Sequence, residues 1–165
     1  MKKLLALMLV LVMVLSLCAC GKKEEAAPKG DDTPAATEEK DSNVFKVNDY
    51  EAVYTGYELL KDKEGKDAIL VKFDFTNNSD VDMAFAFGMY CQLFQGDTSL
   101  DYCTIYLDED ESHAMDDSII EIVSPGKTLQ VQKTYTLKDT TTPVRIQISD
   151  NAEKHAHSLT IDITK

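Results

Sequence analysis

From residue 69 onwards, apolar and polar residues alternate in several segments with the period of a β-strand. Successive side chains of a strand point to opposite faces, so a half-buried strand has an apolar residue at every second position. Four segments show this pattern cleanly. Each predicts a strand with one face in a core and the other in water. The four segments are Ile69–Thr76, Thr128–Leu137, Val144–Ile148 and Leu159–Ile163.

Other segments have a strand-forming composition with weaker alternation. Turn signals separate them, such as Asn77–Asp80 and Ser124–Lys127. No segment repeats its apolar residues with a convincing helical period, although residues 108–117 have room for one helical turn. The further strands that we expect are Phe45–Val47, Tyr50–Leu60, Met83–Phe94, Leu100–Leu107 and Ile119–Val123. About eight short strands with such turns predict an all-β fold, an antiparallel β-sandwich of two sheets.

The N-terminus has a different pattern. Lys2 and Lys3 precede an apolar run, Leu4–Leu17, which is interrupted only by Ser16. A basic start followed by a short apolar core is typical of a secretory signal peptide. A transmembrane helix needs about 20 apolar residues to cross the bilayer. The run is shorter than that, which disfavours the alternative of an uncleaved anchor helix.

The residues that end this run, Leu17-Cys18-Ala19-Cys20, resemble the lipobox of bacterial lipoproteins. In that family the last cysteine receives a diacylglycerol and becomes the first residue after cleavage. The resemblance implies that residues 1–19 are a leader and that Cys20 carries the lipid, because stable attachment to a membrane needs two acyl chains. A redox or metal pair of Cys18 and Cys20 is the weaker interpretation, since Cys18 lies within the leader. The implied location is the extracytoplasmic face of the cell membrane.

A polar stretch follows the lipobox. Residues 21–43 contain no aromatic residue and no Leu, Ile, Val or Met. Such a composition buries too little apolar surface to offset the entropy of ordering, so we expect disorder. Residues 20–43 are therefore predicted to be a lipid-anchored linker with an end-to-end distance on the order of 25 Å. The folded domain is predicted to be residues 44–165.

The charge of the chain restricts its partners. The 17 basic and 29 acidic residues give a formal net charge of −12. This sign argues against nucleic acid as a partner and against a domain that lies flat on anionic lipid. Solubility explains the charge, and a cation or a basic partner is also compatible with it.

Several motifs of the domain look like those of a group of uncharacterised Gram-positive lipoproteins. They are Tyr54–Glu58, Val71–Ser79, Phe94–Gly96 and Ser124–Lys127. The resemblance covers about the whole of residues 44–165. It implies an immunoglobulin-like domain of unknown function, with no activity and no catalytic residues to carry over. Antibody-type domains differ, because they have a core tryptophan and this chain has none.

Cys91 and Cys103 suggest a local crosslink. If Gln95–Ser99 closes a hairpin, the two cysteines stand opposite each other on a core-facing side. The space outside the membrane is oxidising, so this arrangement predicts a disulfide worth about 3 kcal/mol in the chain-entropy model. Two buried free thiols are the alternative.

Two groups of polar residues are weak candidates for a metal site. An acidic block, residues 108–111, is followed by Asp116 and Asp117, and calcium takes six to eight oxygen ligands. The spacing fits no calcium loop, so we favour a solvated loop. His155 and His157 would share a strand face but have no third ligand for zinc. We predict no metal, and the weak candidates are Asp108, Asp110, Asp116 and Asp117.

No catalytic motif is recognisable. The chain has no phosphate loop, no dinucleotide fingerprint and no nucleophile elbow around a serine. We therefore expect no catalytic residues, no cofactor and no enzyme. The leading hypothesis is a non-catalytic binding or accessory module for a protein, peptide or envelope ligand. The alternatives are a structural envelope lipoprotein that assembles with a membrane complex and, third, a metal-dependent enzyme.

Overall fold

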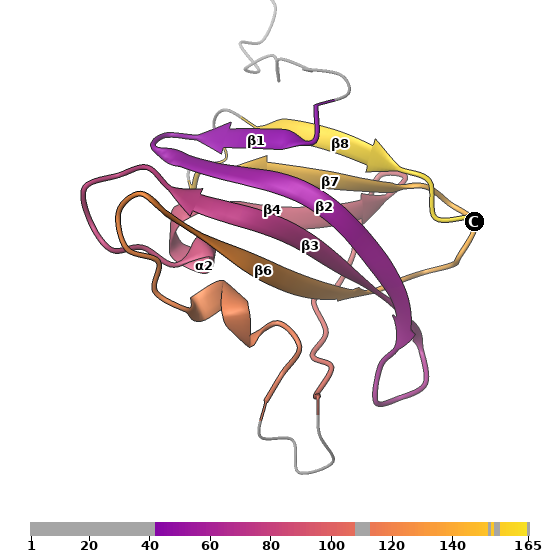
Figure 1. Ribbon diagram of the computed structural model, residues 1–165. Coiled ribbons are helices and arrows are strands. Elements are labelled where there is room, and N and C mark those ends of the chain that lie inside the picture. The colour runs from indigo at the N-terminus through magenta and orange to yellow at the C-terminus, as the bar shows by residue number, and fades with distance from the viewer. Residues whose placement is uncertain (1–41, 108–112, 152, 154–155, 165) are drawn as a thin grey trace, which may run out of the picture. The chain divides into compact units, whose positions relative to one another are not determined.

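Two antiparallel sheets face each other in the computed structural model (Figure 1). The structure describes residues 42–107, 113–151, 153 and 156–164. The first sheet has the order β1 (Val44–Val47), β2 (Tyr50–Lys61), β3 (Asp67–Asn77) and β6 (Lys127–Thr136). The second has the order β5 (Thr98–Ser99), β4 (Tyr90–Gln95), β7 (Val144–Ser149) and β8 (His157–Ile161). Two short helical turns accompany them, α2 (Phe85–Gly88) and η1 (Asp117–Ile120).

The connections between these strands are those of an immunoglobulin-like sandwich. β2, β3 and β6 are neighbours in the order of the A, B and E strands. β5, β4, β7 and β8 are neighbours in the order C′, C, F and G. β1 is an additional edge strand that pairs with β2. The predicted all-β, immunoglobulin-like sandwich of about eight strands is confirmed.

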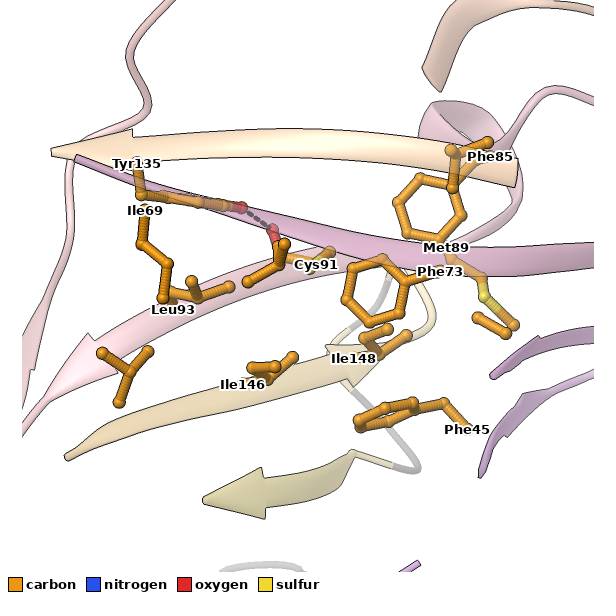
Figure 2. Close-up of a cluster of buried hydrophobic side chains, with 14 of the residues drawn as sticks. Phe45, Ile69, Phe73, Phe85, Met89, Cys91, Leu93, Tyr135, Ile146 and Ile148 are labelled. Carbon is orange, nitrogen blue, oxygen red and sulfur yellow. Dashed lines mark hydrogen bonds between the residues drawn. The ribbon is translucent and has the colours of Figure 1, made fainter. Parts of the chain in front are cut away.

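The core lies between the two sheets and is rich in phenylalanine. The Phe73 ring stacks on that of Phe85 with centroids 5.8 Å apart, and the Phe45 ring meets Phe73 edge-on at 6.1 Å. Figure 2 shows these rings beside Ile146 and Ile148 of the opposite sheet. Burial of each such side chain stabilises the fold by about 1.5–3 kcal/mol. The described core cluster draws only on residues 45–163, and residues 34–165 separate from the rest of the chain as one compact unit.

A bulge in β2 explains why its alternation is imperfect. The register with β3 shifts between Tyr54 and Gly56, where Gly56 has a φ of +148° that other residues rarely adopt. One extra residue changes the parity of the strand. Tyr54 and Tyr57 therefore face the same side although they are three positions apart.

The strands predicted from clean alternation are confirmed, and three of the weaker predictions need correction. The expected strand Met83–Phe94 begins only at β4, and α2 occupies part of the range. The Phe85 side chain is buried whereas Phe87 points outward, which a strand with period two does not produce. A Cβ at Gly88 would lie 3.2 Å from the Met83 side chain, so the close turn at this point favours glycine.

The other two corrections concern the chain between β5 and β6. The expected strand Leu100–Leu107 is replaced by the two-residue β5 and an irregular segment after it. The expected strand Ile119–Val123 is η1 followed by an isolated bridge from Val123 to Met83. The sequence left room for one helical turn within residues 108–117. The described residues 113–116 form no helix, and the turn η1 begins only at Asp117.

The predictions for the N-terminus lie mostly outside the described residues. The leader, Cys20 and the linker up to residue 41 belong to that part. Asn43 already joins the sheet, since its carbonyl accepts the Tyr54 N–H at 2.7 Å. Among the described residues, no helix has the length and apolar character that a membrane span requires.

Candidate functional site

The segment that follows β5 leaves its own sheet and joins the other one. The Thr136 N–H donates to the Asp101 carbonyl at 2.9 Å, and the Cys103 N–H donates to the Thr134 carbonyl at 3.1 Å. Residues 101–103 therefore line the free edge of β6, where the D strand of an immunoglobulin fold pairs with strand E. We call residues 101–106 the crossover segment. It protects an edge that would otherwise expose unpaired backbone groups.

A buried carboxylate fixes the crossover segment to β6. Asp116 is only 2% exposed and accepts a hydrogen bond from the Tyr102 hydroxyl. The Thr134 hydroxyl lies 3.3 Å from the same carboxylate and donates to the Cys103 carbonyl. Burial, followed by the bond to Asp116, raises the pKa of Tyr102, so this hydroxyl remains a hydrogen-bond donor at neutral pH. A buried carboxylate that is held in this way stabilises the loop.

Two hollows open on either side of the crossover segment. The first has a volume of about 300 Å³ and the second about 360 Å³, at the small end of the range of ligand pockets. Tyr102 and Thr104 line both. The first is completed by Tyr106, Ala114, Asp116, Asp117, Ile119 and Ile120. The second is completed by Asp62, Lys63, Glu64, Lys66, Asp101, Cys103 and Thr136.

The turn between β2 and β3 forms the rim of the second hollow. The Asp62 carboxylate accepts the backbone N–H groups of Glu64 and Lys66, both at 2.9 Å. The Lys63 ammonium lies 4.1 Å from the centre of the Tyr106 ring, a cation–π contact. The rim is thus ordered by its own hydrogen bonds and by a contact to the crossover segment.

The structure separates the two cysteines of the predicted disulfide. The β4–β5 hairpin pairs Phe94 with Ser99, one residue out of the register that would place Cys91 opposite Cys103. Cys91 lies in the core, and Cys103 is carried to β6 by the crossover segment. Both thiols are free, and the register on which the predicted bridge depends is wrong. Burial raises the pKa of Cys91 to about 11, which keeps its sulfur as an unreactive thiol.

The weak candidates for a metal site are not brought together among the described residues. The Asp117 carboxylate accepts the Ala114 N–H at 3.0 Å, while Asp116 is held by Tyr102. Asp108 and Asp110 lie outside the described residues. Within the described part of the chain, no group of three or more His, Cys, Asp or Glu is placed to hold a metal ion.

The two histidines of the alternative zinc site also remain unassembled in the described structure. His157 pairs with Ile148 in the β7–β8 ladder, whereas His155 lies outside the described residues. The described structure therefore adds no third ligand to this pair.

An apolar surface beside the first hollow is not apparent from the sequence pattern. Phe87 on α2, Ile120 at the end of η1, and Ile122 are all more than half exposed. The elements α2 and η1 lie side by side. Ile120 also lines the first hollow, so the hollow and the apolar surface are continuous. The strands expected at these positions would have buried every second residue. An exposed apolar surface was therefore not expected there.

The sandwich, its crossover segment and this surface define an immunoglobulin-like domain that displays its distinctive residues beside β6. The chain belongs to the family described as Domain of unknown function (DUF5067), whose model matches residues 24–150. This membership agrees with the resemblance to uncharacterised proteins of unknown function. No curated protein matches the chain.

Three solved structures have a similar fold. An uncharacterised β-sandwich protein from Clostridium difficile is 14% identical, covers 86% of this chain and 99% of its own, and has a TM-score of 0.55. A protein from Enterococcus faecalis is 22% identical, with coverages of 75% and 92% and a TM-score of 0.55. A candidate lipoprotein from Staphylococcus aureus is 16% identical, with coverages of 76% and 95% and a TM-score of 0.54. At these identities the likeness concerns the fold.

Proposed function

We propose that this protein is a lipoprotein of the extracytoplasmic membrane face whose β-sandwich is a non-catalytic binding module for a protein or peptide. The apolar surface beside the first hollow carries the proposal. Large apolar side chains exposed together mark interaction sites more often than chance, because soluble domains otherwise bury them. The surface lies on a domain whose own core is complete without it.

The lipobox resemblance supports the location. Cys20 follows a short apolar leader, and residues 21–43 have the composition of a flexible spacer. One of the similar structures is described as a candidate lipoprotein. A tether of this kind keeps the module close to the membrane and raises its effective concentration for partners there.

The hydrogen bonds of the most suggestive polar groups support a binding role over a catalytic one. Asp116 and Tyr102 satisfy each other, and the Asp117 carboxylate accepts a backbone N–H. A general base or nucleophile needs a free position beside a substrate. These groups instead hold the loop in shape.

A fractionation experiment tests the anchor. The full chain is expressed in a Gram-positive host with a C-terminal tag and fed with labelled palmitate. The wild-type protein should be labelled and found in the membrane fraction, and Cys20→Ser should lose both properties. Cys18→Ser is the matched control and should retain them, because serine is small enough for that position of the motif. Recovery of unlabelled protein with Met1 intact in the cytosol would overturn the proposal.

Crosslinking in the same intact cells tests the binding role. A photoreactive residue in place of Phe87 should join the module to a defined neighbour, and one in place of Glu58, an exposed residue of β2, should not. Crosslinks that appear only with integral membrane proteins, and only with Cys20 intact, would favour the structural alternative. A stoichiometric metal in the purified protein would favour the enzyme.

A further inference from the structure

The apolar surface is formed by two chain segments that meet at one end of the sandwich. Four large side chains are exposed on them: Val81 by 52%, Phe87 by 64%, Ile120 by 59% and Ile122 by 63%. The segments are residues 78–89, which precede β4 and include α2, and residues 113–126, which include η1. The elements α2 and η1 contact each other, and Figure 1 shows η1 below β6 in this view, with α2 close to it. We call these four side chains and their surroundings the apolar end.

The backbone under the apolar end is well fixed. Met83 and Val123 exchange two backbone hydrogen bonds, of 3.1 and 2.9 Å. The buried Asn77 amide donates to the carbonyls of Val81 and Val123, at 2.7 and 2.8 Å. Phe85 anchors α2 in the core through its contact with the Phe73 ring. The exposed side chains therefore stand on a preorganised frame, which lowers the entropy cost of binding.

The Asp and Glu residues of the two segments give the apolar end a negative charge. Asp80, Asp82, Asp117 and Glu121 are all exposed. Residues 78–89 and 113–126 contain no Lys or Arg, and the next cation along the chain is Lys127 at the start of β6. An apolar surface with an acidic rim is complementary to an apolar segment flanked by cations.

Other occupants fit less well. The chain's own linker, residues 21–43, has no aromatic residue, Leu, Ile, Val or Met with which to cover the surface. A second copy would bring the same four acids against these four. Anionic lipid would meet the same repulsion. What remains is a partner polypeptide that is both apolar and basic.

We propose that the apolar end binds a cationic amphipathic segment of another polypeptide, with its apolar side chains on Phe87, Ile120 and Ile122 and its basic side chains on the acidic rim. This inference rests on the proposed binding function and specifies the chemistry of the partner. Helix-in-groove recognition is the closest known mode, in which apolar anchors recur along one face of the ligand.

Binding of synthetic peptides to residues 34–165 tests the proposal. The probe is a peptide of leucine and lysine in an amphipathic helical pattern, labelled with a fluorophore and followed by anisotropy. One control peptide replaces each lysine by glutamate. A second replaces each leucine by serine and keeps the lysines. We expect the leucine–lysine peptide to bind at least about tenfold more tightly than either control, because only it satisfies both features of the surface.

Variants locate the binding. Phe87→Ser combined with Ile122→Ser should weaken binding about tenfold, as expected when central anchors are lost. Leu59→Ser is the matched control, since Leu59 is 41% exposed on β2, and it should bind as the wild type does. Asp82→Asn combined with Glu121→Gln should weaken binding about threefold at low salt, with no difference near 0.5 M salt, where screening acts over a few ångströms.

Three outcomes would overturn the inference. In the first, the serine–lysine peptide binds as tightly as the leucine–lysine peptide. In the second, the Phe87→Ser and Ile122→Ser double variant binds the leucine–lysine peptide as the wild type does. In the third, the protein binds vesicles of anionic phosphatidylglycerol as tightly as it binds that peptide. Each would leave the palmitate result untouched. The inferred partner class can thus fail while the lipid anchor stands, and the anchor can fail while the surface still binds.

Discussion

Replacing Tyr135 by phenylalanine tests how the two sheets are joined at the edge of β4. The Tyr135 hydroxyl, from β6 of the other sheet, donates to the Cys91 carbonyl at 2.6 Å (Figure 2). The Lys133 ammonium donates to the same oxygen at 3.0 Å. Because β5 pairs only with the last residues of β4, these two side chains supply the donors that a neighbouring strand would otherwise provide.

The expected magnitudes follow from this shared acceptor. Tyr135→Phe keeps the buried ring and removes one donor, which should lower the free energy of unfolding by about 1 kcal/mol. Lys133→Met keeps the length of the side chain and should cost about the same. The double variant leaves the carbonyl with neither donor, and an unsatisfied buried group costs about 1–3 kcal/mol more. We therefore expect the double variant to lose about 3–5 kcal/mol, more than the two single losses together.

Urea unfolding of residues 34–165 measures these free energies. Tyr57→Phe is the matched control, because the Tyr57 hydroxyl donates to the Asp162 carbonyl at 3.1 Å in an exposed position. Loss of this hydrogen bond in Tyr57→Phe should lower the free energy of unfolding by less than about 0.5 kcal/mol. If the free energy lost in the double variant equals the sum of the two single losses within about 0.3 kcal/mol, the Cys91 carbonyl has another donor. That result would refute this explanation of the junction. Burial raises the pKa of Tyr135, so the hydroxyl remains a donor throughout the usual pH range.

Three further predictions follow from the same structure. Phe85→Ala should cost about 3–5 kcal/mol of unfolding free energy, whereas the exposed Phe87→Ala should change it by less than about 0.5 kcal/mol, as urea titration will show. Hydrogen bonds from the backbone and hydroxyls of residues 141 and 142 lower the pKa of Asp139 to about 2. The ionised Asp139 therefore stabilises the folded state fully above its unfolded pKa, near 4, and this contribution is lost as the pH falls through 2. The urea midpoint of the wild type should therefore fall more between pH 4 and pH 2 than that of Asp139→Asn; equal slopes would contradict this. Mass spectrometry after alkylation should find Cys103 modified slowly and Cys91 modified only after unfolding, while a protein 2 Da lighter than its reduced form would establish the disulfide instead.

The strands that could be predicted from sequence are those whose two faces differ. β3 and β6 run through the centre and the edge of one sheet, with a core on one side and a polar face on the other. Their alternation is therefore imposed by burial and is visible in the sequence. The alternation of apolar and polar residues in β2 is harder to recognise, because the bulge at Gly56 shifts which residues face the core.

The short helical turns could not be predicted in the same way. One turn of helix is too short to display a period of 3.6, and Phe85, Phe87 and Met89 are spaced as in a strand. The contact between Tyr102 and Asp116 joins residues 14 positions apart with no local motif between them. It depends on the path of the chain through space, which composition and periodicity do not encode.

That path changes at Leu100, and the change has several consequences. Leu100 still donates to the Leu93 carbonyl of β4, but Cys103 is already bonded to β6. The switch carries Cys103 away from Cys91, so the hairpin geometry of the predicted disulfide is lost. It also brings the following residues to the β6 side, where η1 lies against β6 and beside α2 and leaves Ile120 and Ile122 exposed. In natural proteins, local rules fail most often at functional sites, where stability is exchanged for activity. The part of this sandwich that departs most from its sequence pattern is also the part that displays the apolar end, and this coincidence is the strongest physical reason to search for the partner there.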